Sequence, residues 1–183
     1  MFNLTDFYGC DLFEGFDKLT VSEMELVKLR SLKELAAEHQ CEYGIAHNAN
    51  GFCSPFTSGL EDKVRIPDEV YVGNEIRLYH CHTNNTCLSR DDLSLLINPT
   101  VQRITVITPL GVVFSARRGN GVLPTLDEFN MYAEEIAAEV NIELTERDGF
   151  YEWSLERRFH EAVKEEAFII TRYFGWIIEG GML

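Results

Sequence analysis

The sequence predicts an α/β (α+β) fold in which helices flank a central mixed sheet. Three observations support this class. Several short runs alternate apolar and polar residues as half-buried strands do. Helix-capping sequences precede longer runs with helical periodicity. The chain has 183 residues, 45% of them hydrophobic, with no repeat or linker, so we expect residues 1–183 to form one domain with one core.

The first twenty residues are expected to be irregular. This aromatic-rich arm, residues 1–20, could pack onto the domain or onto a partner, and the sequence leaves both open. Ser22 and Glu25 then form a capping box, which predicts a helix that ends near His39.

Strands are expected at residues 42–47 and 52–57, joined by the hairpin signal Asn50-Gly51. The following stretch is rich in turn residues, with a short strand expected at 64–66 before Pro67. Residues 76–82 alternate apolar and polar side chains and predict the next strand.

The second half of the chain predicts a helix at 89–97 and two strands, 104–108 and 112–115, separated by a Pro-Leu-Gly turn. Two C-terminal helices are expected within residues 124–175. The first begins after the capping box Thr125-Glu128 and runs to about Val140. The second extends from about Trp153 to Phe174 and carries an apolar stripe expected to be core: Leu155, Phe159, Ala162, Val163, Ile170 and Tyr173.

A candidate metal site lies in the middle of the sequence. His80 and His82 are two apart on a predicted strand, so both imidazoles point to one face while Cys81 points to the other. Six residues separate them from Ser89, and Asp92 falls in the first turn of the helix that Ser89 begins. Two imidazoles and one carboxylate leave one tetrahedral position open for water, as catalytic zinc sites do.

This ordered set resembles the JAMM (MPN+, JAB-like) zinc metalloprotease family, whose signature is an upstream Glu, His-x-His and Ser-x-x-Asp. The resemblance covers roughly Glu42 to Arg117 and implies an MPN-like domain with its metal-site core at 42–117. It implies that His80, His82 and Asp92 bind one Zn²⁺, that Glu42 is the general base, and that Ser89 donates a hydrogen bond to the oxyanion. Zinc lowers the pKa of bound water to roughly 7, which makes such hydrolysis feasible at neutral pH.

Two features depart from the family pattern. Thr83 replaces the Pro that often follows the second His, and the spacer before Ser89 has six residues in place of seven, as in small bacterial or phage-associated members. The resemblance implies an isopeptidase or peptidase that acts at the C-terminus of a ubiquitin or ubiquitin-like protein. The alternatives are a hydrolase of a phage or toxin-system polypeptide or of a small amide conjugate, and a non-catalytic MPN scaffold that binds partners.

Other interpretations of the same residues stay open. Ser89-x-x-Asp92 is also a helix-capping box. Glu34, Glu38 and Glu75 could replace Glu42 as the base. Cys81 and Cys87 could contribute to a structural zinc site. The remaining histidines that have no partner pattern are expected to be surface or satisfied residues: His39, His47 and His160.

Composition restricts partners and location. A net charge of −14 repels phosphate backbones and makes nucleic acid an unexpected partner. Residues 124–166 hold 13 acidic and 4 basic residues, which suits either solvated helix faces or a basic partner such as a ubiquitin-like tail.

Five cysteines without regular spacing favour reduced thiols. With no signal peptide and no membrane span in the sequence, we expect a cytoplasmic protein; Gly180-Gly181 is expected to be punctuation after the last helix.

Overall fold

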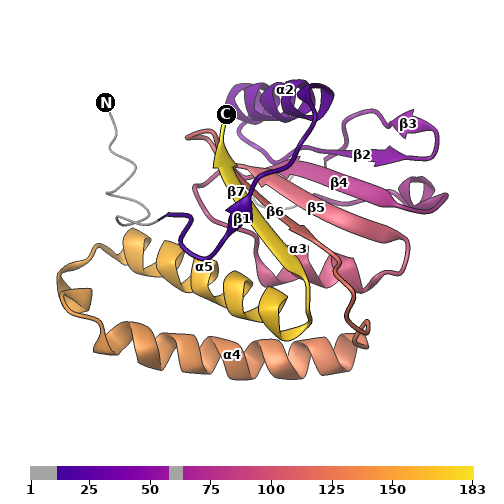
Figure 1. The fold of residues 1–183 in the computed structure, drawn as a ribbon. Coiled ribbons are helices and arrows are strands. Elements are labelled where there is room, and N and C mark those ends of the chain that lie inside the picture. The colour runs from indigo at the N-terminus through magenta and orange to yellow at the C-terminus, as the bar shows by residue number, and fades with distance from the viewer. Residues whose placement is uncertain (1–11, 58–63) are drawn as a thin grey trace.

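A seven-stranded mixed sheet forms the centre of the computed structural model, which describes residues 12–57 and 64–183 (Figure 1). The strand order is β1-β7-β6-β5-β4-β2-β3. Two pairs, β1–β7 and β4–β5, are parallel, and the others are antiparallel, so the predicted mixed sheet is confirmed. The strands are β1 Asp17–Lys18, β2 Gly44–Asn48, β3 Gly51–Phe52, β4 Ile76–Cys81, β5 Val101–Ile107, β6 Val112–Arg117 and β7 Ile177–Met182.

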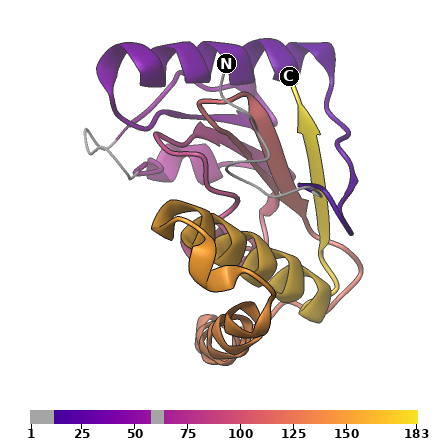
Figure 2. The same ribbon diagram turned by 90° about the vertical axis from the view of Figure 1, so that its left-hand side faces the viewer.

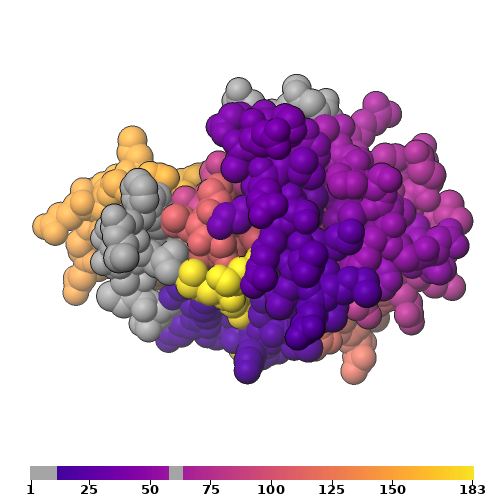
Figure 3. Space-filling model, turned by 90° about the horizontal axis from the view of Figure 1, so that it is seen from above, coloured from indigo at the N-terminus to yellow at the C-terminus, as the bar shows by residue number. Residues whose placement is uncertain are grey.

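The helices cover both faces of this sheet. Helix α2 lies on one face, and α3, α4 and α5 lie on the other (Figures 1 and 2). Figure 3, seen from the side of α2, shows the indigo residues of this helix facing the viewer. The buried apolar residues accordingly form two clusters, the larger one between the sheet and α4 and α5, the smaller one under α2. The bounds are α2 Glu23–His39, α3 Arg90–Ser94, α4 Leu126–Glu146 and α5 Leu155–Tyr173, with 3-10 turns at Asp68–Tyr71, Leu95–Ile97 and Phe150–Glu152.

The predicted capping boxes are confirmed at the starts of α2, α3 and α4. In each, the side chain of Ser22, Ser89 or Thr125 accepts a bond from the backbone N–H three residues on. The Glu or Asp at that third position accepts a bond from the capping residue's own N–H. These bonds satisfy backbone donors that a helix start otherwise leaves free.

Several predicted bounds were wrong. Helix α4 continues six residues past Val140 to Glu146, because Leu144 still packs into the core. The helix predicted over 89–97 changes to a 3-10 turn after Ser94. Residues 64–66 form no strand, and the strand predicted over 52–57 is confined to Gly51–Phe52, with one further bridge between Gly44 and Phe56.

The apolar stripe predicted for the last helix was also partly wrong. Leu155, Phe159 and Tyr173 are 82%, 57% and 52% exposed. Ile170 is buried as predicted, and Ala162 and Val163 pack against the core. The other buried residues of α5 were not in the predicted stripe, and two of them are ionisable: His160, Glu161, Ala167 and Thr171. Only a narrow side of the helix faces the sheet and α4, so periodicity alone placed three exposed residues in the stripe.

The described part of the N-terminal arm, residues 12–20, packs onto the domain. The ring of Phe16 stacks on Phe168 at a centroid distance of 5.9 Å and lies edge-on to Phe114 at 6.0 Å. Strand β1 then pairs with β7. Residues 1–11, including Cys10 and the remaining aromatic residues of the arm, lie outside the described residues.

Strand β7 was not predicted, and it contains the Gly180-Gly181 pair. Gly180 is opposite Phe114 in the sheet, and a Cβ atom there would lie 2.3 Å from the ring of Phe13. The glycine therefore gives the arm room to pack, and it is not punctuation after a helix. Within the described residues, no helix is both long and apolar enough to cross a bilayer.

Candidate metal centre

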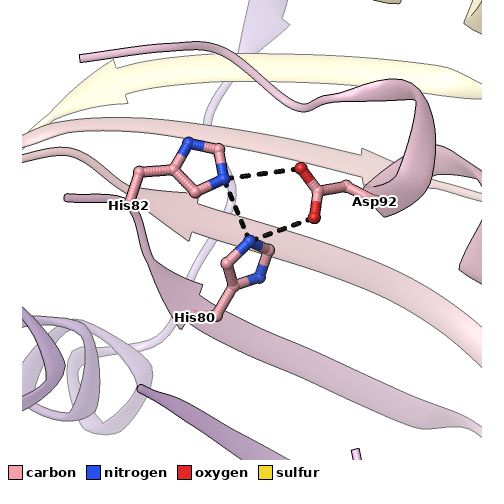
Figure 4. A group of neighbouring side chains, drawn as sticks. All are labelled: His80, His82 and Asp92. Atoms are coloured by element: carbon pink, nitrogen blue, oxygen red, sulfur yellow. Dashed lines mark hydrogen bonds and ion pairs between the residues drawn. The ribbon is translucent and has the colours of Figure 1, made fainter. Parts of the chain in front are cut away.

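His80, His82 and Asp92 converge on one point at the carboxyl end of β4 (Figure 4). One possible ligand atom from each lies within 4.8 Å of the others, and all three residues are buried. Among residues 12–57 and 64–183, no other set of three His, Cys, Asp or Glu side chains converges in this way.

Strand β4 and its continuation place the two histidines. His80 pairs with Val106 of β5, and the N–H of His82 donates to the carbonyl of Ile107 at 3.0 Å, which extends the ladder past the end of the strand. The pleat then directs both imidazoles to the face that carries α3 and α5. Cys81 points the other way, into the apolar cluster under α2, as predicted.

The three side chains are close enough to share one ion. The Nε2 atoms of His80 and His82 are 3.0 Å apart. Asp92 reaches both, with Oδ1 3.1 Å from the Nε2 of His80 and Oδ2 3.4 Å from the Nε2 of His82. Two imidazole nitrogens and one carboxylate are ligand types that zinc and other transition metals accept.

The orientation of the His82 ring is set by the loop that follows it. Its Nδ1 lies 3.0 Å from the carbonyl oxygen of Thr86, so Nδ1–H donates there and Nε2 keeps its lone pair for a ligand bond. The hydroxyl of Thr86 contacts the same Nδ1 at 3.0 Å and donates to Asn84.

Asp92 is positioned by the capping box of α3. Its Oδ2 accepts bonds from the backbone N–H and the hydroxyl of Ser89, each at 2.7 Å. Burial alone would raise the pKa of Asp92, but the charges and hydrogen bonds of His80 and His82 outweigh it, so the pKa lies well below its usual value. The carboxylate is therefore ionised, as a metal ligand must be.

Glu42 lies beside the three converging residues. It precedes β2, and continuing the β2–β4 register beyond the Gly44–His80 pair brings Glu42 opposite His82. The side chain is 6% exposed. Burial raises the pKa of Glu42; His82 and His80 partly offset this, and the Asp92 charge adds to it. A carboxyl with a raised pKa is suited to exchanging protons near neutral pH.

Ser89 is close to the site through Asp92. Its single hydroxyl hydrogen is donated to Asp92, so an oxyanion role requires that hydrogen to turn away from the carboxylate. The capping interpretation of this residue is confirmed, and its oxyanion role stays a prediction.

The other candidate residues lie apart from this group. Glu34 and Glu38 are exposed on α2, across the sheet, and Glu75 is exposed at the opposite end of β4. His39 is exposed and His47 half-buried. Cys41, Cys53, Cys81 and Cys87 are free thiols, and burial raises the pKa of the Cys81 thiol to about 11. Cys81 and Cys87 belong to apolar clusters on opposite faces of the sheet, so a shared zinc site is excluded for them.

His160 is a buried neighbour that the sequence did not identify. It lies on the inward side of α5, 3% exposed, and interacts with the backbone of Asn85 in the loop between His82 and Ser89. Burial lowers its pKa, and the nearby Glu156, Asn85 and Glu161 partly offset this. No sequence pattern links residue 160 to this loop, because only packing brings them together.

A cavity of about 650 Å³ opens onto the three converging residues. Glu42, His80, His82, Ser89 and Asp92 all line it, so every residue of the predicted site borders one space. Its volume is in the range of small-molecule binding sites. The remaining lining residues are mainly apolar and come from sequence-distant segments.

Comparison with known proteins finds no matching family model, no similar curated protein and no similar solved structure.

Proposed function

We propose that this protein is a zinc-dependent hydrolase of amide bonds, of the JAMM/MPN+ type. The observation that carries the proposal is the convergence of His80, His82 and Asp92 on a cavity that Glu42 also lines. A closed structural zinc site has four protein ligands. This group has three among the described residues, and the cavity supplies room for water and substrate.

The ligand types support zinc over calcium or magnesium. Two of the three candidate ligand atoms are imidazole nitrogens, whereas calcium and magnesium take oxygen ligands almost exclusively. The hydrogen bond from His82 to the Thr86 carbonyl and those from Ser89 to Asp92 are outer contacts typical of metal ligands.

In this proposal, the zinc ion and the residues around it have separate roles in hydrolysis. A bound zinc ion supplies Lewis-acid activation of water and of the scissile carbonyl. Glu42, with its raised pKa, accepts the proton of the attacking water and passes it to the leaving amine. Ser89 holds Asp92 in place, and its hydroxyl would stabilise the developing oxyanion once its hydrogen turns away from that carboxylate.

Two substrate classes fit this proposal. The family resemblance supports a polypeptide, in particular the C-terminus of a ubiquitin-like protein. The cavity of about 650 Å³ beside the site favours the second class, a small amide conjugate, because small-molecule sites have volumes in this range. A non-catalytic scaffold is less well supported, since binding a partner does not require a buried carboxyl beside a three-ligand group.

The decisive experiment separates metal binding from turnover. Wild-type protein is expected to bind one zinc ion per chain, and His80→Ala and Asp92→Asn to lose most of it. Glu42→Gln is expected to keep the zinc yet lose at least about 100-fold in turnover, since general acid–base catalysis contributes on the order of 10²–10⁴. Zinc content and hydrolysis of a panel of ubiquitin-like fusions and acyl amino acids are measured on the same preparations. Full activity in Glu42→Gln would disprove the assigned base, and absence of zinc from the wild type would disprove the metal centre.

A further inference from the structure

The cavity beside the metal centre has an apolar part built from three layers of the fold. Leu78 and Ile104, on the adjacent strands β4 and β5, form its floor and are 2% and 0% exposed. Phe56 and Ile66 line it from the segments around β3 and before the Asp68–Tyr71 turn, and Val163 and Phe159 line it from α5. Because these side chains face one space, apolar atoms of a ligand would lose contact with water there.

The apolar wall directly adjoins the metal centre. Phe56 and Gly44 exchange two backbone hydrogen bonds of 2.7 Å, and Gly44 is in turn the register partner of His80. A Cβ atom on Gly44 would lie 2.5 Å from the Phe56 ring. Because residue 44 has no side chain, the Phe56 ring can lie close to β4, the strand that carries the histidines.

Arg65 contributes a positive charge to the same cavity. Among the described residues, Arg65 is the only arginine or lysine in the lining, which also carries the carboxylates Glu42, Asp91 and Asp92. Within residues 12–57 and 64–183, no carboxylate lies within ion-pair distance of Arg65. The same is true of Arg30, Arg118, Arg157, Arg158 and Arg172, but none of these lines the cavity. In a chain of net charge −14, a cation that lines the cavity and pairs with no carboxylate of the described residues suits an anionic ligand.

We propose that this cavity binds a carboxylate-bearing residue with a large apolar side chain, that is, the C-terminal residue of a short peptide or of an N-acylated amino acid. Its side chain lies on the floor of Leu78 and Ile104, and its carboxylate pairs with Arg65. As a statement about substrate, this rests on the proposed function. Hydrolysis breaks the amide C–N bond; the water oxygen joins the acyl carbon and one water proton goes to the released amine.

Ligand binding tests the cavity separately from catalysis. The probes are N-acetylphenylalanine, N-acetylphenylalaninamide, which lacks the carboxylate, and N-acetylglycine, which lacks the apolar side chain. Each is titrated by NMR into the wild type and into His80→Ala, in which hydrolysis and metal ligation by the probe are impaired. N-acetylphenylalanine is expected to bind at least tenfold more tightly than either other probe in both proteins.

Pairs of variants, each a substitution in the cavity and a control outside it, test where N-acetylphenylalanine binds. Phe159→Ala is expected to weaken N-acetylphenylalanine binding several-fold, whereas Leu155→Ala, one turn away on α5 and outside the cavity lining, leaves it unchanged. Arg65→Gln is expected to abolish the preference for the acid over the amide, whereas Arg30→Gln on α2 preserves it. Equal binding of the three probes, or equal effects of each substitution and its control, would overturn the inference. Zinc content, measured in parallel, decides the metal centre independently of this result.

Discussion

Glu25 caps helix α2 and is also buried against strand β4. It caps α2 by accepting a bond from the N–H of Ser22 at 2.7 Å, yet it is 4% exposed because it also reaches Tyr79 and Arg77 on β4. Burial by itself raises the pKa of this carboxyl. The hydrogen bonds from Tyr79 and Ser22, with the charge of Arg77, outweigh that effect and lower the pKa to about 2.

The first prediction concerns the pH dependence of this contact. Because the folded pKa is below the ordinary value of 4.5, the ionised Glu25 contributes stability above pH 4.5, which is lost as pH falls towards 2. The full contribution is about 3 kcal/mol, from roughly 1.4 kcal/mol for each pKa unit. Glu25→Gln is therefore expected to lower the free energy of unfolding more at pH 6 than at pH 3, as measured by urea titration.

The exposed Glu23, in the same first turn of α2, provides the control. Glu23→Gln should change the free energy of unfolding by a few tenths of a kcal/mol at most, as exposed charges do. If the loss in Glu25→Gln were the same at both pH values, the depressed pKa would be refuted.

Helix α3 has only five residues, Arg90–Ser94, and is followed directly by a 3-10 turn. Its capping box serves two purposes, since Ser89 both starts the helix and fixes the carboxylate of Asp92. The capping box of α2 has the same chemistry but lies on the other face of the sheet. The two serines therefore allow the capping role to be separated from the role at the metal.

The second prediction compares these serines. Ser89→Ala and Ser22→Ala are each expected to lower the free energy of unfolding by about 1 kcal/mol, the usual cost of losing an N-cap. Only Ser89→Ala is expected to weaken zinc binding, by roughly 10–100-fold, because outer contacts orient metal ligands. Competition titrations with a chelator of known affinity measure this. Equal zinc affinity in both variants would mean that Asp92 holds its position without Ser89.

A cluster of charged side chains, mostly buried, connects the N-terminal arm to strands β5, β6 and β7 through hydrogen bonds and ion pairs. Glu179 of β7 bonds with Arg103 of β5 and, at 2.9 Å, with Arg117 of β6. Arg103 also donates to the carbonyl of Thr20 at 2.7 Å, and the N–H of Thr20 donates to Glu179. Arg103 and Glu179 are 7% and 2% exposed, so each depends on the other for its charge to be compensated.

The third prediction follows from that dependence. Glu179→Met is expected to lower the free energy of unfolding by about 3–5 kcal/mol, because it leaves the Arg103 charge buried without its partner. The double variant Arg103→Met/Glu179→Met is expected to be more stable than this single variant. Arg117, which is partly exposed, can turn to solvent. Thermal and urea unfolding of the three proteins measure the difference; a double variant less stable than the single one would show that the arginine is not the source of the loss.

Features that depend on neighbours within a few residues could be predicted from the amino-acid sequence. Capping boxes join residues three apart, so Ser22, Ser89 and Thr125 marked three helix starts correctly. Alternation along β4 was enough to predict that His80 and His82 share a face and that Cys81 does not. The candidate ligands could be named in advance for the same reason, since two lie on one strand and the third follows a helix cap.

Features that depend on contacts between sequence-distant residues become visible only in the folded chain. Strand β7 exists because the sheet and the arm cover a glycine-rich segment that has weak strand propensity of its own. Glu42 lies opposite His82 through the β2–β4 register, and His160 reaches the metal loop from α5. The cavity combines Phe56, Arg65 and Phe159 from three separate segments. Packing of the whole chain selects such neighbours, and no local pattern of residues encodes them.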